Sequence, residues 1–329
     1  MDYNFYRFRW LCLVTPAQQI DFVDSLYSSG DLSQLFYHWV ELFKPHLVKY
    51  QLLRREGWPA DLLASGFLFF YGCCFYLFCL VSDIIPYIES VVDYTLLYML
   101  VDNYLDSQVL TETAISEMKQ VLTDDEFEPT EKYVREIREV YLRLCAKHSQ
   151  VKARLIDLFS IEVAGLAVQN NSQCSYDQYL KMGLSKGAAT FPVVAAFLSE
   201  AEIRGIQCST RIQDLTRDLG AIMQLLDDML DIEQDQNNQC HTVMTNWITN
   251  HDNLDELWWH MLSMIEQLSP PFAIWGWIYS LILVYLPMRN PQYFSEQLRQ
   301  LANKYNPLAF CNGSEILLSE LTHALNSAQ

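Results

Sequence analysis

The stretch "STRIQDLTRDLGAIMQLLDDMLDIEQD", residues 209–235, decides the fold of this chain. Ser209 is a suitable N-cap, and apolar residues then recur at intervals of three and four, which predicts one amphipathic α-helix. Asp227, Asp231 and Asp235 stand at i, i+4 and i+8, so such a helix carries all three on one face. Like charges placed in this way repel by roughly 0.2–0.5 kcal/mol per pair. An acidic row of this kind indicates a bound cation that offsets the repulsion.

Helical patterns run through the rest of the chain as well. Residues 87–119 contain neither glycine nor proline, and residues 131–170 repeat apolar positions at three and four. Short polar segments separate these stretches, and no internal repeat on the order of 20–50 residues is present. We therefore predict an all-α fold, a single-domain helical bundle over residues 1–329 around a central apolar cavity, with N-terminal helices in residues 1–90.

Composition narrows the classes of function. The 329 residues are 51% hydrophobic and carry a formal charge of −18, a field that argues against nucleic acid and anionic membrane surfaces as partners. An anionic substrate would need cations as intermediaries. The nine cysteines form no CxxC pair, and the first residues, "MDYNFYRFRWLCLV", lack the pattern of a signal peptide, so we expect reduced thiols and a cytoplasmic location.

One segment has to be weighed as a membrane span. Residues 62–82 contain no charge over 21 positions, which is long enough to cross a bilayer. The flanking residues, Asp61 and Asp83, are acidic, however, and no cluster of lysine or arginine adjoins the segment. We interpret it as a buried helix of a large helical domain, and we expect no stable membrane span.

A second acidic pair lies in "LLYMLVDNYLDS", residues 96–107, where Asp102 and Asp106 are four positions apart at the end of another apolar run. Carboxylate oxygens are the ligands of Mg²⁺, which bridges to substrate phosphates. Two helices that face each other across a cavity could hold several such ions. The alternative is a pair of solvated helix ends. The Mg²⁺ hypothesis, with three ions once substrate is bound, assigns the metal ligands Asp102, Asp106, Asp227, Asp231 and Asp235.

Three motifs carry a family resemblance. "LTRDLGAIMQLLDDMLDIEQD" resembles the second aspartate-rich helix of trans-isoprenyl diphosphate synthases, in which a glycine and a glutamine precede DDxxD. Here Gly220 and Gln224 precede Asp227, Asp228 and Asp231.

The other two motifs fall in the same order along the chain. "LVDNYLDS" is similar to the family's first motif, with Asn103 where its second aspartate usually stands. "YDQYLKMGLSKGAATFP", residues 176–192, resembles the intervening helix, and Lys186 matches the lysine that reaches the diphosphate. Over residues 94–235 the chain thus resembles the class I terpenoid synthase superfamily, which implies a catalytic core at about residues 91–310.

Departures from the motifs of the trans-isoprenyl diphosphate synthases favour the terpene cyclases of this superfamily over the chain-elongating synthases. Chain-elongating synthases bind a second diphosphate with a Gly-Lys-Arg element and an Arg-Arg-Gly element, and neither is present. Asp227, Asp231 and Asp235 fill the three metal-binding positions of terpene cyclases. Lys181, 46 positions before Asp227, and the Lys304-Tyr305 pair stand where cyclases carry arginine and Arg-Tyr; a surface lysine is the alternative reading of each.

The resemblance implies an Mg²⁺-dependent terpene synthase, a carbon–oxygen lyase that ionises a linear isoprenyl diphosphate (farnesyl preferred, geranylgeranyl next) and releases pyrophosphate. One alternative is an isoprenyl diphosphate synthase or other prenyltransferase, and another is a non-catalytic scaffold or regulatory subunit. A homodimer is left open. Tyr98, one turn before Asp102, could limit substrate length. The predicted catalytic residues are Asp102, Asp106, Asp227 and Lys186, and the predicted substrate-binding residues are Lys186, Lys181, Gln224, Tyr98, Lys304 and Tyr305.

Overall fold

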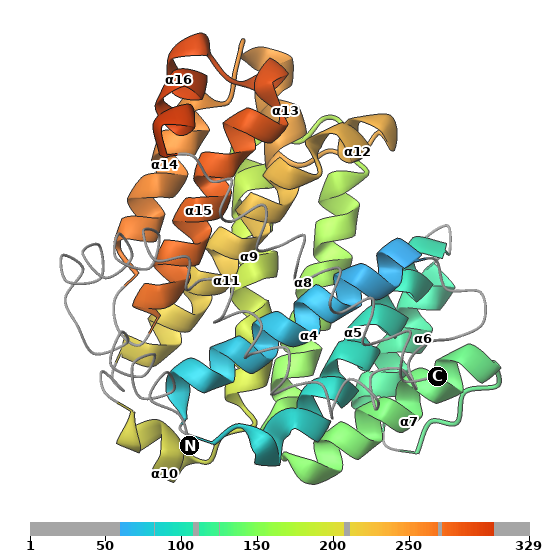
Figure 1. Cartoon of the computed structure of the whole chain (residues 1–329). Helices are drawn as coiled ribbons and strands as arrows, with labels where there is room; N and C mark the ends of the chain where they lie inside the picture. The colour runs from blue at the N-terminus through green and yellow to red at the C-terminus, as the bar shows by residue number, and fades with distance from the viewer. Residues whose placement is uncertain are drawn as a thin grey trace. The chain divides into compact units, whose positions relative to one another are not determined.

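A computed structural model describes residues 60–305 with the exception of residues 82, 108–111, 125, 207–210 and 269–271. Within these ranges the regular elements are all helices and no strand occurs, which confirms the predicted all-α class (Figure 1). The elements are α4 (Ala60–Leu80), η1 (Ile85–Tyr87), α5 (Ile88–Ser107), α6 (Glu112–Thr123), α7 (Lys132–Lys147), α8 (Val151–Gln169), α9 (Tyr176–Ala195), α10 (Glu200–Gly205), α11 (Ile212–Leu230), α12 (Ile232–Asn237), α13 (Val243–Asn250), α14 (Asp255–Glu266), α15 (Ala273–Arg289), η3 (Pro291–Tyr293) and α16 (Glu296–Tyr305).

The chain divides into two compact units. Among the described residues, the first unit comprises Gly165–Ala188 and residues 211–305, and the second comprises residues 60–164 and 189–206. Helices α8 and α9 each continue from one unit into the other. The single-domain organisation predicted for the whole chain stays a prediction, and its N-terminal helices before Ala60 lie outside the described residues.

The second unit is built around α5, which packs against α4 and α7. Aromatic side chains join its elements: the ring of Tyr76 stacks on Phe191 at 4.9 Å, and the Tyr94 hydroxyl donates a hydrogen bond to the carbonyl of Thr190 at 3.1 Å. Asp93 is buried on α5 and accepts hydrogen bonds from Arg143 and Lys147 of α7. Charge-assisted bonds of this kind fix the register between the two helices.

We interpreted residues 62–82 as a buried helix; residues 62–80 of this segment form most of α4, which ends at Leu80. Its core-facing side chains include Phe70, Cys73, Cys74 and Tyr76, each with at most 1% of its surface exposed. Over the described residues, no helix has both the length and the hydropathy that a membrane crossing requires.

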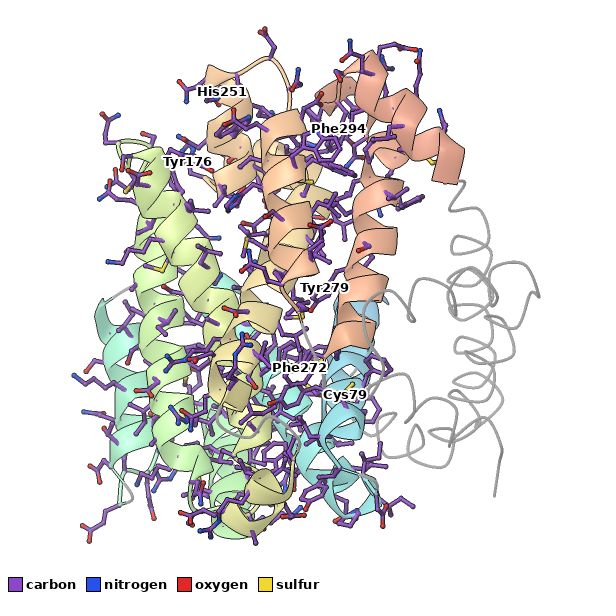
Figure 2. All side chains as sticks on the ribbon, turned by 90° about the vertical axis from the view of Figure 1, so that its left-hand side faces the viewer. Cys79, Tyr176, His251, Phe272, Tyr279 and Phe294 are labelled. Atoms are coloured by element: carbon purple, nitrogen blue, oxygen red, sulfur yellow. The ribbon has the colours of Figure 1, made fainter. Side chains whose placement is uncertain are left out.

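Helix α11 is the central element of the first unit and contacts α12, α13, α14 and α15. Fully burying a large aliphatic side chain stabilises a fold by about 1.5–3 kcal/mol, so an apolar stripe of this length largely determines how α11 packs. The Tyr279 hydroxyl of α15 reaches α11 and donates to the carbonyl of Leu219 at 3.1 Å (Figure 2). The buried stripe, with the predicted spacing of three and four, consists of Leu215, Leu219, Ile222, Leu226 and Met229.

Helices α9 and α11 touch through two glycines. A Cβ atom added to Gly187 would lie 2.1 Å from the carbonyl oxygen of Gly220 and 2.8 Å from the Cβ of Gln224. No side chain fits at these distances, so only glycine at position 187 allows the two backbones to approach so closely. This contact sets the distance between the helix that carries Lys186 and the helix that carries Asp227.

We predict that Gly187→Ala destabilises the protein by about 1–3 kcal/mol, because the added methyl group collides with backbone and not with a flexible side chain. Chemical denaturation followed by circular dichroism measures the change. Gly205→Ala is the matched control, since a Cβ there meets nothing within 4 Å. Equal stability of the Gly187→Ala variant and the wild type would contradict the close helix contact.

Candidate functional site

The acidic row, defined as Asp227, Asp231 and Asp235, lies at the junction of α11 and α12. The single helix predicted over residues 209–235 is wrong at its end, because α11 stops at Leu230 and Asp231 adopts φ −99° and ψ 10° before α12 begins. At its start, α11 begins at Ile212 with Arg211 in the N-cap position, and the predicted N-cap, Ser209, lies outside the described residues. The hydrogen bonds nevertheless continue: Asp231 N–H donates to the Asp227 carbonyl at 3.0 Å, and Asp235 N–H donates to the Asp231 carbonyl at 2.9 Å. The i, i+4, i+8 succession of the row therefore continues through the bend.

Desolvation raises the pKa of all three members of the row, and repulsion between carboxylates adds to the rise at Asp227 and Asp235. Asp227 is exposed at the surface, but the protein around it partly desolvates its carboxylate, and with repulsion from Asp231 and Asp235 this raises its pKa to about 6. Desolvation and the charge of Asp231 likewise raise the pKa of Asp235 to about 6, against a hydrogen bond from Thr242. Desolvation raises the pKa of Asp231, and the Arg289 guanidinium opposes that shift. The three carboxylates are thus close enough to repel one another.

Asp228 occupies the interior behind the row. It is 7% exposed, and its Oδ1 accepts a hydrogen bond from Gln224 Nε2 at 2.9 Å. Burial raises its pKa to about 7, against the hydrogen bond from Gln224. Gly183 on α9 adjoins this carboxylate, and a Cβ there would lie 3.6 Å from Asp228 Oδ2, which is an ordinary van der Waals distance. The half-buried Gln224 and the buried Asp228 therefore form a polar pair that is distinct from the acidic row.

Lys186 is half-buried on α9 next to the acids. Gly165 on α8 accommodates its aliphatic stem, since a Cβ at position 165 would lie 2.9 Å from Lys186 Cδ. Its positive charge lowers the pKa of Asp227, Asp228 and Asp235 against the larger effect of desolvation. The first unit thus brings together predicted residues that are about 40 positions apart in sequence: Lys186, Gln224 and the acidic row.

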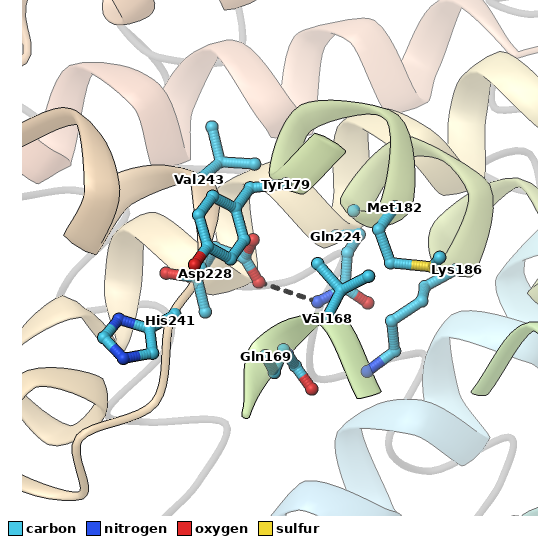
Figure 3. A pocket seen from close by; sticks show the side chains of 11 residues that line it. Val168, Gln169, Tyr179, Met182, Lys186, Gln224, Asp228, His241 and Val243 are labelled. Atoms are coloured by element: carbon cyan, nitrogen blue, oxygen red, sulfur yellow. Dashed lines mark hydrogen bonds between the residues drawn. The ribbon is translucent and has the colours of Figure 1, made fainter. Parts of the chain in front are cut away.

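A small recess opens between Lys186, Gln224 and Asp228, and no member of the acidic row lines it (Figure 3). It encloses about 10 Å³, which is space for roughly one water molecule. Its volume is too small for a hydrocarbon chain, and the central apolar cavity stays a prediction. The lining residues are Val168 and Gln169 of α8, Tyr179, Met182, Gly183 and Lys186 of α9, Gln224 and Asp228 of α11, and His241, Thr242 and Val243.

The donor chemistry of the row fits a hard divalent cation. Carboxylate oxygens are the preferred ligands of Mg²⁺, and a bound cation would relieve the repulsion that raises the pKa of Asp227. As the side chains stand, however, no three His, Cys, Asp or Glu groups of the described ranges converge in a way that could hold a metal ion. Side-chain rotation around a cation is therefore part of any binding event at this row.

The other predicted site residues are placed as follows. Asp102 and Asp106 lie on α5 of the second unit, where Asp102 is exposed and the Asp106 side chain lies outside the description. Tyr98, also on α5, is half-buried and stacks on Phe69 with ring centroids 4.4 Å apart.

Lys181 is exposed on α9 of the first unit. Lys304 and Tyr305 end α16, and their side chains too lie outside the described part.

Sequence reasoning missed Arg289, Asn290 and Thr242. The charge of Arg289 lowers the pKa of Asp231 against desolvation, Asn290 Nδ2 donates to the carbonyl of Met229 at 3.4 Å, and a hydrogen bond from Thr242 lowers the pKa of Asp235. Arg289 and Asn290 lie in a polar segment that is far from the acidic row in the sequence, so no local sequence pattern connects them with it. The spacing of Gly183 and Gly187, one helical turn apart, is a signal that could have predicted the close contact with α11.

No family model matches this chain, and neither the curated proteins nor the solved structures contain a match to it. The resemblance to class I terpenoid synthases therefore rests on the sequence motifs alone. The site has to be judged by its own geometry and charge.

We predict that the metal-free protein becomes less stable as pH rises. The folded-state pKa of Asp228, about 7, lies above the value of about 3.9 for an unfolded aspartate, so the folded state binds this proton more tightly. Its stabilising contribution is complete below about pH 4 and is lost as pH rises through about 7. Asp228→Asn, which cannot ionise, should reduce the fall in melting temperature between about pH 5 and about pH 8 in EDTA.

Asp252→Asn is the control for that measurement, because Asp252 is exposed in the loop between α13 and α14. It should leave the pH dependence of the wild type unchanged. An Asp228→Asn protein whose melting temperature follows the same pH curve as the wild type would contradict a raised pKa at Asp228.

Proposed function

We propose that this chain is an Mg²⁺-dependent class I terpene synthase that ionises a linear isoprenyl diphosphate and releases pyrophosphate. One observation carries the proposal: Lys186 lies within electrostatic reach of the acidic row, on a helix that touches α11 through Gly187 and Gly220. An anion-binding cation beside carboxylates suited to metal is what a metal–diphosphate complex requires. Farnesyl diphosphate is the preferred substrate and geranylgeranyl diphosphate the next.

Lys186 has the clearest role among the chain's own residues. Its ammonium group would donate hydrogen bonds to diphosphate oxygens and stabilise the negative charge that develops as the carbon–oxygen bond breaks. Gln224 donates a hydrogen bond to Asp228 on α11, and this bond restricts the rotation of both side chains next to the acidic row. Lys181, Lys304 and Tyr305 remain further candidates for diphosphate contacts.

The carboxylates have the complementary role. Asp227, Asp231 and Asp235 would hold Mg²⁺ in the first unit, and Asp102 and Asp106, on α5 of the second unit, stay predicted metal ligands. When bound, Mg²⁺ acts as a Lewis acid that neutralises the diphosphate. With a net charge of −18, the protein repels a free diphosphate, so we expect the substrate to bind only together with the cations.

The deciding experiment is incubation with farnesyl diphosphate and Mg²⁺, with and without radiolabelled isopentenyl diphosphate. Hexane-extractable hydrocarbons or alcohols, seen by gas chromatography together with pyrophosphate release, support the terpene synthase. Label in a longer prenyl diphosphate instead assigns the chain to the prenyltransferases. No pyrophosphate release from any isoprenyl diphosphate, in a folded protein, supports the non-catalytic alternative.

We predict that Lys186→Ala lowers kcat by about 10²–10³-fold, because it removes a charged donor from the departing diphosphate. Asp227→Ala and Asp102→Ala should each abolish turnover while the helical circular dichroism spectrum is retained. Lys132→Ala, at the exposed start of α7, is the control and should leave turnover unchanged. Unchanged kinetics of the Lys186→Ala protein would move the anion-binding role to Lys181 or Lys304.

A further inference from the structure

The last two turns of α5 are held from the side by a tyrosine of α7. The Tyr133 hydroxyl donates a hydrogen bond to the carbonyl of Leu100 at 3.1 Å, and it accepts one from Asn103 Nδ2 at 3.0 Å. Leu100 and Asn103 lie about one turn apart on α5, which packs against α7 (Figure 1). One hydroxyl group therefore joins two successive turns of α5 to the first turn of α7.

Two further contacts fix the same end of α5. The ring of Tyr104 stacks on the ring of Tyr133, with centroids 6.1 Å apart and planes inclined by 17°. The Tyr104 hydroxyl donates to Glu117 Oε2 of α6 at 3.2 Å. Helix ends fray unless other elements hold them. All of these residues belong to the second unit, so the end of α5 is held there against both α6 and α7.

The hydrogen bonds explain why asparagine stands at position 103, where the aspartate-rich motif has its second aspartate. The Tyr133 hydroxyl has one proton, which it donates to the carbonyl of Leu100. Its oxygen can therefore only accept from residue 103, which requires a donor at that position. The asparagine amide is such a donor, whereas an ionised aspartate has acceptors only. An aspartate at position 103 would have to take the Tyr133 proton away from Leu100.

Asp102, the neighbour of Asn103, is exposed, whereas Asn103 is half-buried. A carboxylate on a frayed helix end would sample many positions. A metal ligand, in contrast, has to be held to within about 0.5 Å of its working position. The hydrogen bonds of Tyr133 and Asn103 fix the backbone from which the Asp102 side chain projects, and they do so without using the Asp102 carboxylate.

We propose that Tyr133 and Asn103 are positioning residues, which hold the end of α5 so that Asp102 keeps one place for a metal-bound diphosphate. This inference rests on the proposed function, in which Asp102 is a metal ligand. In this role neither positioning residue contacts the substrate, and both act through the backbone of α5. The asparagine in the motif then serves to hold the helix end, and an aspartate there would not improve the site.

Turnover of farnesyl diphosphate by the full-length protein, measured against Mg²⁺ concentration, tests the inference. Tyr133→Phe keeps the ring but loses the hydrogen bonds to Leu100 and Asn103. The Mg²⁺ concentration for half-maximal turnover should rise by about tenfold or more, while kcat at saturating Mg²⁺ changes much less. Asn103→Asp should shift the Mg²⁺ dependence in the same direction, although it adds a carboxylate. Calorimetric titration of Mg²⁺ in the presence of inorganic pyrophosphate should show the same losses without turnover.

Tyr141→Phe is the matched control. Tyr141 lies on the same helix, and its hydroxyl donates to the carbonyl of Leu122 on α6 at 2.6 Å. Loss of this bond should lower the melting temperature and leave the Mg²⁺ dependence of the wild type unchanged. Amide hydrogen exchange in the absence of Mg²⁺ and substrate is a further readout. Exchange at the end of α5 should be faster in Tyr133→Phe than in the wild type or in Tyr141→Phe.

The outcomes separate the inference from the proposed function. A Tyr133→Phe protein with a lower melting temperature and the Mg²⁺ dependence of the wild type overturns the inference, because its hydroxyl then has only a structural role. An Asn103→Asp protein that binds Mg²⁺ more tightly than the wild type overturns it too, as does unchanged hydrogen exchange at the end of α5 in Tyr133→Phe. The proposed function stands in each of these cases. A wild-type protein that releases no pyrophosphate from any isoprenyl diphosphate overturns the proposed function and this inference with it.

Discussion

The contact between Gly187 and Gly220 is the constraint on which the first unit depends. Because Gly187 has no side chain, α9 reaches the backbone carbonyl of Gly220 on α11, and the polar side chains on either side of the contact come within reach of one another. Lys186 then stands next to the acidic row, and Asp228 fits beneath Gly183. Larger residues at this crossing would separate the helices and leave a lysine and an aspartate on unrelated surfaces. The chemistry of the site is thus a consequence of helix packing.

The polar groups where α9 crosses α11 lower the stability of the folded protein. Burial of a carboxylate is unfavourable unless it is compensated, and here burial raises the pKa of Asp228 to about 7 although Gln224 donates to it. The neighbouring carboxylates repel one another across a bend that Asn290, Gln292 and Tyr293 hold from the side. A fold optimised only for stability would place apolar or neutral residues here. Strongly perturbed groups gathered in one place are typical of sites that bind ligands, which is the physical ground for the functional proposal.

Much of the fold could be predicted from the sequence, because helical periodicity is a local property. The spacing of Leu215, Leu219 and Ile222 predicted the buried face of α11, and the uncharged run that begins at Leu62 is the helix α4. The position of Lys186 next to the row was expected only from the motif. The bend at Asp231 and the approach of Arg289 could not be predicted, since both depend on side chains far away in the chain. Whether Asp102 and Asp106 complete the site stays a prediction, because they belong to the second unit.

The division of the chain has a practical consequence for anyone who wishes to dissect this protein. Both units are discontinuous: the first takes Gly165–Ala188 from the middle of the sequence, and the second takes residues 189–206 from beyond it. The crossing points fall inside α8 and α9, so a cut at either would create helix ends with about four unpaired N–H or C=O groups each. Neither unit can be produced by truncation as one contiguous fragment. Genetic fusion, split-protein reporters and fragment exchange therefore have to use the loops between helices, such as residues 170–175 or 251–254.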